Sequence, residues 1–344
     1  MLSVRILQPD SKAIAEAADA LRRGLLVAFP TETVYGLGAA AANPDAIKRL
    51  YAAKGRPTNH PVIVHLADKK QLHEWASHVP DGAWRLAEAL MPGPLTLILP
   101  RNSRVPDSVT GGQSTVGLRV PNHPVAHALL QAFGDGVAAP SANKFGRLSP
   151  TTAQDVASDF ADEVEIILDG GPCEVGIEST IVEFDPDGTA RILRPGMIHA
   201  RQITELIGCR VDTAFGAGAP TAKNAQSRAP GGLPSHYAPN TKLTVVPAEI
   251  LQHEITRFAE QHKRIALLSF QPAHGAITTV IAPHSPRLYA QLLYSNLRKL
   301  DREQADLIVV EAVPQTDEWS GIADRLRRAA AETEAKLPEG GTAK

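Results

Sequence analysis

The feature that most constrains the fold of this chain is a long segment without apolar periodicity. It runs from Thr213 to Pro239, is rich in Gly, Ala, Pro and Ser, and separates two stretches in which strand-like and helix-like patterns alternate. A chain of 344 residues is long for one domain and comfortable for two. The sequence therefore predicts a first domain over residues 8–208, a linker over 209–240 and a second domain over 241–336.

Strand-length apolar runs outnumber helical patterns in the first domain. Residues 10–24 predict a helix, because a capping aspartate precedes apolar residues on one face and basic residues and a glycine follow. Further helices are expected at 43–53 and 200–208, and strands at 25–29, 62–67, 95–100, 114–120, 136–140, 164–170, 179–184 and 190–196. So many strands with few helices between them favour an α/β fold with a large twisted mixed sheet.

The second domain shows a more regular alternation. Strand patterns at 242–247, 264–270 and 306–313 alternate with helical ones, including 285–304. This rhythm is typical of a smaller Rossmann-like α/β domain with a mostly parallel sheet.

Composition excludes several classes of protein. A net charge of −2 argues against a large basic surface for nucleic acid. Cys173 and Cys209 are far apart and suit neither a disulfide framework nor a zinc cluster, so we expect plain core or surface thiols. No apolar run approaches the roughly 20 residues of a membrane helix, and the N-terminal residues lack a secretion-signal pattern. The expected location is cytoplasmic.

The sequence "GLGAAA" from Gly36 to Ala41 is close to a dinucleotide-binding fingerprint. That fingerprint needs its first glycine directly after a strand and an acidic residue about 20 positions later. Here "PTETVY" separates the expected strand from Gly36, and the residue 20 positions on is Arg56. The fingerprint reading therefore fails, and we expect the glycines to let the backbone pack closely beside a ligand held by Thr33. A phosphate loop of the form G-x-x-x-x-G-K-[ST] is also missing.

The sequence "KGRP" suggests another way to bind phosphate. Lys54 and Arg56 flank a glycine just past an expected helix, and alternate side chains of an extended segment point to the same side. They could clamp a polyphosphate, or they could only complement the helix dipole. As phosphate ligands they are expected to be exposed and to contribute little to core packing.

Three further features could belong to a site. "APSAN" at 139–143 follows an expected strand, where open α/β sheets place ligands, although Ser and Asn are also common in turns. His65 lies inside a strand pattern and could be either a core residue or a ligand. Arg119 also lies on a strand and needs a carboxylate or phosphate partner if it is buried.

No metal-protease, dithiol, serine-nucleophile or paired-carboxylate motif is found. An enzyme with this sequence would therefore act by positioning and electrostatics.

Seven segments together resemble the YrdC-like family of threonylcarbamoyl-AMP synthases: "PTETVYGLGAAA", "KGRPTNHPVIVH", "MPGPLTLIL", "STVGLRVPNHP", "APSANKFGRLSPTTAQDV", "GIESTIVEF" and "LRPG". The resemblance covers roughly residues 10–200 in order. The linker ending in "HYAP" and the α/β domain after it are similar to the two-domain branch of this family.

The resemblance implies that ATP, L-threonine and bicarbonate or CO2 give threonylcarbamoyl-adenylate and pyrophosphate. Mg²⁺ would be carried by ATP, with no direct protein ligand. The product would pass to a separate tRNA threonylcarbamoyl-transferase complex. Threonine's amine would capture CO2, and the resulting carboxylate would attack the α-phosphorus, so the protein needs no side-chain nucleophile.

The family pattern also implies roles for individual residues. The catalytic residues that contact the polyphosphate would be Lys54 and Arg56. The other nucleotide contacts would be His60, Thr115, Ser141, Asn143, Ser149, Arg194, His236 and Tyr237. Threonine would be held by Thr33, His65, Arg119, Ala139, Ser179 and Thr180, with Arg119 as the partner of its carboxylate.

The sequence departs from the family pattern at two places. His60 stands where the family commonly has Asn, and "APGGLPSHYAP" lacks the Met and basic residues that usually precede "HYAP". If the linker closes over the site as a lid, His236 and Tyr237 would be its contacts. Two alternatives remain: a non-catalytic RNA-binding protein on this fold, with weak RNA binding, and a carbamoyl-adenylate-forming enzyme of another pathway.

Overall fold

The structure, a computed structural model, describes residues 4–160, 163–185, 188–213, 228–231 and 236–334, with side chains described up to residue 331. The chain forms two compact units. The first comprises Met1–Phe145 and Ser149–Gly232, and the second comprises Gly146–Leu148 and Leu233–Lys344. Much of the expected linker, residues 214–227 and 232–235, lies outside the described residues, as do 335 and 336 at the end of the expected second domain.

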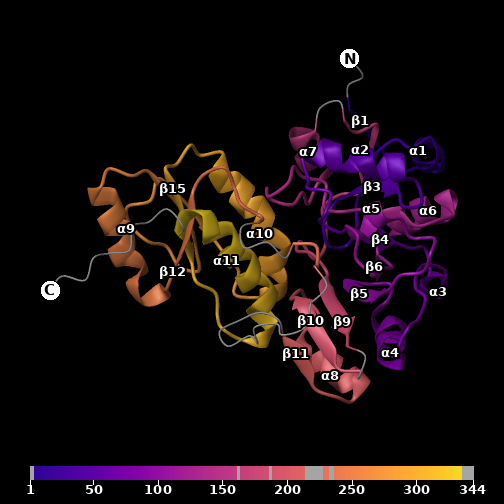
Figure 1. Cartoon of the computed structure of the whole chain (residues 1–344). Coiled ribbons are helices and arrows are strands. Elements are labelled where there is room, and N and C mark those ends of the chain that lie inside the picture. The colour runs from indigo at the N-terminus through magenta and orange to yellow at the C-terminus, as the bar shows by residue number, and fades with distance from the viewer. Residues whose placement is uncertain (1–3, 161–162, 186–187, 214–227, 232–235, 335–344) are drawn as a thin grey trace. The chain divides into compact units, whose positions relative to one another are not determined.

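The first unit is built on one mixed sheet (Figure 1). Its strands are β1 (Arg5–Leu7), β2 (Val27–Phe29), β3 (Gly36–Ala40), β4 (Ile63–His65), β5 (Leu95–Pro100), β6 (Thr115–Arg119), β7 (Val137–Ala138), β8 (Ile166–Leu168), β9 (Thr180–Phe184), β10 (Ala190–Arg194) and β11 (Val211–Thr213). Their order is β1-β8-β2-β3-β7-β4-β6-β5-β9-β10-β11. The predicted large mixed sheet is confirmed.

Short helices connect these strands. They are α1 (Ser11–Arg22), α2 (Pro44–Lys54), α3 (Leu72–Trp75) after the 3₁₀ turn η1 (Lys69–Gln71), α4 (Asp81–Leu90), α5 (Asp107–Thr110), α6 (Pro124–Phe133), α7 (Ala153–Asp159) and α8 (Ala200–Ile207). In α2 the Asn43 side chain accepts from the first-turn N–H groups, Pro44 occupies the first turn, and Gly55 ends the helix at φ 62°. These local signals explain why the helix was predictable.

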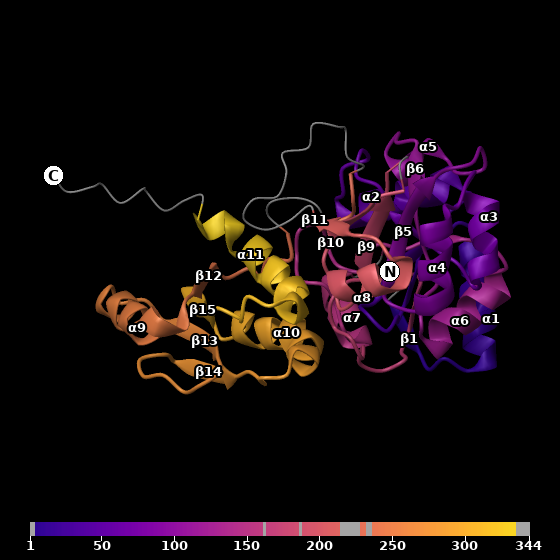
Figure 2. The same cartoon turned by 90° about the horizontal axis from the view of Figure 1, so that it is seen from below.

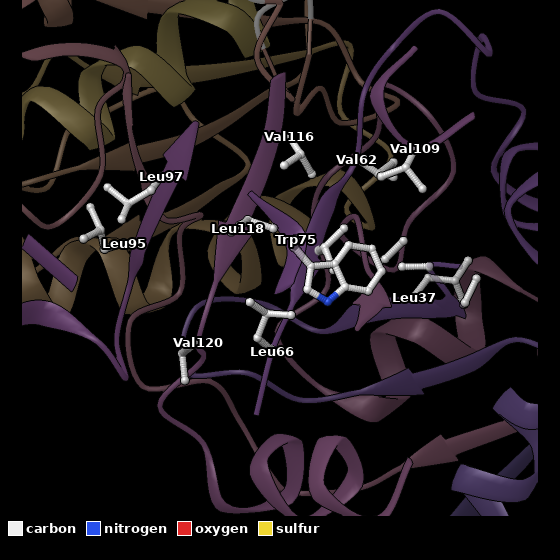
Figure 3. Close-up of a cluster of buried hydrophobic side chains, with 14 of the residues drawn as sticks. Leu37, Val62, Leu66, Trp75, Leu95, Leu97, Val109, Val116, Leu118 and Val120 are labelled. Carbon is white, nitrogen blue, oxygen red and sulfur yellow. The ribbon is translucent and has the colours of Figure 1, made fainter. Parts of the chain in front are cut away.

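Alternation along the central strands gives the sheet two different faces. Val116 and Leu118 of β6 pack into the main apolar core, together with Leu95 and Leu97 of β5 and with Trp75 (Figure 3). Successive side chains of a strand point to opposite faces, so the intervening β6 residues, Thr115, Gly117 and Arg119, face the other side. That second face carries the candidate site.

Farther along the sheet, a separate apolar cluster covers this second face. It includes Val27 and Phe29 of β2, Val137 of β7, and residues of α1 and α6 such as Leu21 and Leu129. The site is therefore flanked by a packed layer of helices.

Strand β3 was not predicted, because its sequence is the glycine-rich "GLGAAA". A Cβ on Gly38 would lie 2.9 Å from Phe29 Cε1 and 2.9 Å from Val137 Cγ1, and one on Gly36 would lie 3.2 Å from Ala139 Cβ. The close approach that these glycines allow is thus to neighbouring strands and the segment after β7. Because both glycines lie within a strand, the structure agrees with rejection of the dinucleotide fingerprint.

The extent of the first unit differs in detail from the expected range 8–208. β11 pairs in parallel with β10 and buries Val211, so the sheet extends past residue 208. Gly146–Leu148 belong to the second unit, where Gly146 O accepts a hydrogen bond of 2.9 Å from Ala238 N.

The second unit is a three-layer α/β domain (Figure 2). Its strands β12 (Leu243–Val246), β13 (Ile265–Ser269), β14 (Thr278–Ile281) and β15 (Leu307–Glu311) form a parallel sheet in the order β12-β15-β13-β14. Helix α9 (Leu251–Glu260) follows the 3₁₀ turn η2 (Ala248–Ile250) and covers one face. Helices α10 (Pro286–Asp301) and α11 (Ser320–Glu334), the latter after η3 (Asp317–Trp319), cover the other. The predicted parallel domain is confirmed.

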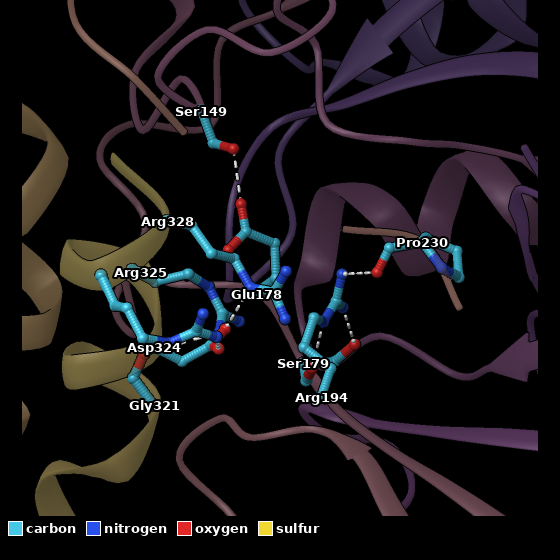
Figure 4. Close-up of polar contacts among 10 residues, drawn as sticks. Ser149, Glu178, Ser179, Arg194, Pro230, Gly321, Asp324, Arg325 and Arg328 are labelled. Carbon is cyan, nitrogen blue, oxygen red and sulfur yellow. Dashed lines mark hydrogen bonds and ion pairs between the residues drawn. The ribbon is translucent and has the colours of Figure 1, made fainter. Parts of the chain in front are cut away.

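Helix α11 holds a buried charged cluster. Asp324 Oδ2 accepts a hydrogen bond of 2.9 Å from Arg328 Nε and lies 3.1 Å from Arg325 Nη1 (Figure 4). Burial disfavours the charged carboxyl, but the guanidiniums outweigh it and hold the pKa of Asp324 below its ordinary value.

Cys173 is buried and Cys209 is exposed, and both are free thiols, as expected. Among the residues described, none of the helices combines the length and the apolar character needed to cross a bilayer.

Candidate active site

His65 and Arg119 form the centre of the polar face. They are register partners on the parallel strands β4 and β6, so their side chains emerge side by side. Both residues are buried, at 3% and 4% exposure. Burial, together with the Arg119 charge, lowers the pKa of His65 to about 3, so the imidazole is neutral at pH 7. Its Nδ1 is buried and has no hydrogen-bond partner within the described part of the chain.

The guanidinium of Arg119 is held on one side by protein acceptors. Its Nη2 lies 2.8 Å from Glu32 Oε1 in an ion pair, and its Nε donates to the Gly93 carbonyl oxygen at 3.3 Å. Nη1 makes no hydrogen bond or ion pair to any residue that the structure describes. Glu32 was not among the predicted site residues.

Thr33 lies in the same turn as Glu32. It is fully buried, and its Oγ1 lies 2.8 Å from Thr31 Oγ1. Thr31 also donates to the Val34 carbonyl oxygen at 2.7 Å, which closes the turn between β2 and β3.

Lys54, at the last position of α2, is buried rather than exposed as expected, with 2% of its surface accessible. Its ammonium donates to the carbonyl oxygen of Ser141 at 2.6 Å and to that of Asn143. Burial, and secondarily the Arg56 charge, lowers the pKa of Lys54 well below its ordinary value. The expectation of exposure was wrong because the 141–145 loop folds back over the helix end.

Arg56 is also buried, at 8% exposure, against the expectation. Its Nη2 donates to the Pro61 carbonyl oxygen at 2.7 Å, and its guanidinium lies 5.6 Å from the centre of the Phe145 ring. The His60 ring contacts the same phenyl group edge-on at 5.6 Å. Because Phe145 N also donates to the Lys54 backbone carbonyl oxygen at 2.9 Å, Phe145 joins Arg56 and His60 to the end of α2 in one cluster.

The "APSAN" segment follows β7 and crosses this cluster. Ala139 N donates to the Ile63 carbonyl oxygen at 2.9 Å, and Ser141 forms a β-bridge with Gly36. Asn143 is buried, and its Nδ2 donates to the Lys144 carbonyl oxygen at 2.8 Å. The structure thus brings the predicted nucleotide residues Ser141 and Asn143 next to Lys54.

Ser149 and Thr115 occupy other parts of the first unit. The Ser149 hydroxyl donates to the Glu178 carboxylate, a partner that the sequence analysis did not identify (Figure 4). Thr115 begins β6 on the same face as Arg119 and is half-buried.

Ser179 and Arg194 are joined by hydrogen bonds at the edge of the polar face (Figure 4). Arg194 donates from Nε to the Ser179 carbonyl oxygen and from Nη2 to Ser179 Oγ, both at 3.1 Å. Ser179 Oγ also lies 2.8 Å from Thr96 Oγ1. Thr180 faces away from this group, because its hydroxyl donates to the Ile198 carbonyl oxygen at 2.9 Å and accepts from Ile198 N at 3.1 Å.

Residues 228–231 of the expected linker lie on the first unit. Arg194 Nη1 donates to the Pro230 carbonyl oxygen at 3.0 Å (Figure 4). The Gln113 side chain donates to the Arg228 carbonyl oxygen at 3.1 Å and accepts from Arg228 N. Burial lowers the pKa of His60, and the charges of Arg56 and Arg228 add to this effect.

His236 and Tyr237 belong to the second unit. Their rings meet at 4.1 Å between centres, and Tyr237 adopts φ 62°, a left-handed conformation uncommon for residues other than glycine. The Arg325 guanidinium lies 5.2 Å from the Tyr237 ring centre.

The residues missed by the sequence analysis are mostly partners of those it found. Glu32 carried a visible signal, since it lies between two threonines at a strand end and its charge is opposite to that of Arg119. Glu178, Thr96 and Gln113 had no comparable signal. Within the described ranges, no three His, Cys, Asp or Glu side chains gather into a group that could hold a metal ion.

Two family models together span most of the chain. The Sua5/YciO/YrdC model, described as "Telomere recombination", matches residues 19–196. The model described as "Threonylcarbamoyl-AMP synthase, C-terminal domain" matches residues 198–331.

Full-length relatives are similar over nearly the whole chain. The threonylcarbamoyl-AMP synthase of Bacillus subtilis is 40% identical, covering 94% of each chain. That of Pyrococcus abyssi is 39% identical, covering 91% of this chain and 92% of its own. The crystal structure of P. abyssi Sua5 complexed with L-threonine matches with a TM-score of 0.87 and 36% identity, over 96% of this chain and 97% of that one. Sequence and structure agree that the chain belongs to the Sua5/YciO/YrdC family, in the form that carries the threonylcarbamoyl-AMP synthase C-terminal domain.

Proposed function

We propose that the protein is a threonylcarbamoyl-AMP synthase, which condenses L-threonine, bicarbonate or CO2 and ATP into threonylcarbamoyl-adenylate and pyrophosphate. The relatives that bear this name match both units at about the same length. The observation that carries the proposal is the buried Arg119–His65 pair. Within the described residues, His65 Nδ1 makes no hydrogen bond. The contacts of Arg119 there are at Nε and Nη2, which leaves Nη1 for a ligand.

These two nitrogens suit the polar groups of threonine. Arg119 Nη1 would donate to the α-carboxylate, in a charge-assisted hydrogen bond made stronger by burial. Neutral His65 would form a hydrogen bond through Nδ1 to the side-chain hydroxyl of threonine. Nδ1 of a neutral imidazole donates or accepts, depending on which ring nitrogen carries the proton. Thr33, Ala139 and Ser179 would line the pocket, and Thr180 would act by fixing Ser179.

The cluster around Phe145 would hold ATP. Lys54 and Arg56 supply two positive charges for the polyphosphate, which the residues of the 141–145 loop already position. The remaining proposed nucleotide contacts are His60, Thr115, Ser141, Asn143, Ser149 and Arg194. We retain His236 and Tyr237 as linker contacts of the nucleotide on the family resemblance alone.

The reaction then needs little from the protein beyond placement and charge. The threonine amine adds to CO2 and loses a proton, which gives an N-carboxylate. One oxygen of this carboxylate forms a bond to the α-phosphorus of ATP. The bond between the α-phosphorus and the oxygen that bridges to the β-phosphate breaks, and pyrophosphate leaves with that oxygen. This is a nucleotidyl transfer, and Lys54 and Arg56 would offset charge on the leaving group. Mg²⁺ would enter with ATP as the counter-ion of its phosphates.

We further propose that the enzyme acts in the cytoplasm and passes its product to a tRNA threonylcarbamoyl-transferase complex. The mixed anhydride of a carbamate and AMP hydrolyses readily, so a consumer of the product must act soon after its release. No specific observation favours the RNA-binding alternative, since the chain has a net charge of −2.

The test is pyrophosphate release from ATP by the full chain in the presence of Mg²⁺. We expect release to require both L-threonine and bicarbonate, and to fall sharply when L-serine replaces threonine. The proposal would be rejected if pyrophosphate release were the same with and without L-threonine, or if a protein that binds ATP released no pyrophosphate.

A further inference from the structure

Glu32 forms an ion pair with the arginine at the centre of the proposed threonine site. Its Oε1 lies 2.8 Å from Arg119 Nη2, and each side chain is only 5% exposed. The other carboxylate oxygen, Oε2, accepts a hydrogen bond of 3.0 Å from Asn122 N. Both oxygens of this buried carboxylate therefore have a fixed partner.

The backbone around Glu32 is fixed as well. Thr31 Oγ1 accepts from Thr33 N at 3.2 Å and from Val34 N at 3.3 Å, so one side chain closes the turn that contains Glu32. The Glu32 carbonyl oxygen accepts a hydrogen bond of 2.8 Å from Val175 N. The carboxylate is thus placed by the fold before any ligand arrives.

This placement determines how Arg119 presents its guanidinium. Gly93 O at Nε and Glu32 at Nη2 occupy one edge of the planar group, so Nη1 points away from both. The contact with Glu32 is an ion pair without hydrogen-bond geometry, so Glu32 acts on Arg119 mainly through its charge. A buried arginine without a counter-charge would be costly and would turn toward other acceptors.

We propose that Glu32 is a positioning residue, which orients Arg119 so that Nη1 meets the carboxylate of the amino-acid substrate. This inference rests on the proposed function, because it takes threonine as the ligand of Arg119. Glu32 itself need not contact the substrate. Its role is to keep a buried cation oriented and charge-balanced between turnovers.

The test compares three variants by calorimetric titration of the full chain with L-threonine and, separately, with ATP and Mg²⁺. Glu32→Gln keeps the shape of the side chain and removes its charge. Glu32→Asp keeps the charge but moves the carboxylate away from Arg119, because the side chain is one methylene shorter. The matched control is Glu311→Gln, because Glu311 is a buried glutamate in the second unit whose Oε2 accepts a hydrogen bond of 2.7 Å from Phe270 N.

We expect Glu32→Gln to weaken threonine binding by about tenfold to a hundredfold while ATP binding changes by less than about twofold. Glu32→Asp should recover part of the threonine affinity, and Glu311→Gln should leave both ligands unaffected. A purely structural role would lower both affinities together and would not respond to the conservative change.

Unchanged threonine binding in a folded Glu32→Gln protein would overturn the inference, as would equal losses for threonine and ATP. If Glu32→Gln fails to fold, Glu32→Asp decides: we expect a selective loss of threonine affinity, and wild-type affinity would reject the role. Failure of the wild-type protein to bind threonine would instead reject the proposed function, so the two failures can be told apart.

Discussion

Lys54 donates a hydrogen bond of 2.6 Å from its ammonium to the carbonyl oxygen of Ser141, which is distant in sequence. The contact joins the end of α2 to the loop after β7. A residue that the sequence presents as a solvent-facing phosphate ligand is thus also a structural tie. Substitutions at this position should consequently affect both chemistry and stability.

Lys54→Met keeps the aliphatic length of the side chain and removes its donors. We expect pyrophosphate release to fall strongly, and the free energy of unfolding of the first unit to fall by about 1–3 kcal/mol, because the Ser141 and Asn143 carbonyl oxygens lose their partner. Turnover assays and urea unfolding measure the two effects. Lys48→Ala, an exposed position on the same helix, is the control and should change neither. Wild-type turnover in Lys54→Met would remove Lys54 from the catalytic residues.

Acid should destabilise the first unit through His65. Its folded pKa of about 3 lies below its ordinary value of 6.5, so the unfolded chain binds the extra proton between these values. The contribution of His65 to the free energy of unfolding is fully present above pH 6.5 and is lost as the pH falls toward 3. By pH 5 this group has cost the first unit about 2 kcal/mol.

His65→Gln should lack that part of the pH dependence. Urea unfolding at pH 7 and pH 5, followed by tryptophan fluorescence in a Trp319→Phe background, reports on the first unit. His253→Gln, an exposed histidine on α9, serves as the control. The same acid sensitivity in His65→Gln and wild type would show that His65 is not the group responsible.

Arg194→Ala should loosen residues 228–231. The variant loses the donor to the Pro230 carbonyl oxygen and both donors to Ser179. We expect faster hydrogen–deuterium exchange in the peptide that covers 228–231 and weaker ATP binding. Arg191→Ala changes the same strand but removes only a pair with Asp185, so exchange in that peptide should stay at the wild-type rate. Equal exchange in Arg194→Ala and wild type would contradict the anchoring role.

Gly38→Ala should destabilise the first unit more than Gly36→Ala. The new methyl group at position 38 would lie 2.9 Å from two side-chain carbons and 3.1 Å from the Val27 carbonyl oxygen, whereas its nearest neighbour at position 36 would be 3.2 Å away. We expect a loss of about 1–3 kcal/mol for Gly38→Ala and a smaller one for Gly36→Ala. Urea unfolding of the two variants would show this order, and the reverse order would refute the packing explanation.

Local signals made much of the fold predictable. Asn43 and Pro44 mark the start of α2 and Gly55 marks its end, and each lies within one residue of the end that it marks, so no distant information was needed. Strand β3 has Leu37 as its one bulky apolar residue, and the neighbours Phe29 and Val137 explain why glycine is required at position 38. Its strand conformation is a property of the assembled sheet.

The candidate site was predictable in its residues but not in their environment. Lys54 was identified from "KGRP", yet its burial depends on a loop that follows a distant strand. Arg119 was correctly expected to need a partner if buried, but only the structure identifies Glu32 as its partner within the protein. Pairings between distant segments leave little trace in a single sequence, whereas caps and periodicity do.

The alternation along β6 has a consequence for how the protein can change. Odd-numbered positions 115, 117 and 119 face the site, and even-numbered positions 116 and 118 face the apolar core. A slip of one residue against β4 would exchange the two sets, so the pairing that keeps the core dry is the pairing that aims Arg119. The parity of a position therefore predicts which property a substitution alters. Substitutions at the odd-numbered positions of β6 would change ligand specificity and leave the apolar core as it is. Substitutions at the even-numbered positions would change stability and leave the site as it is.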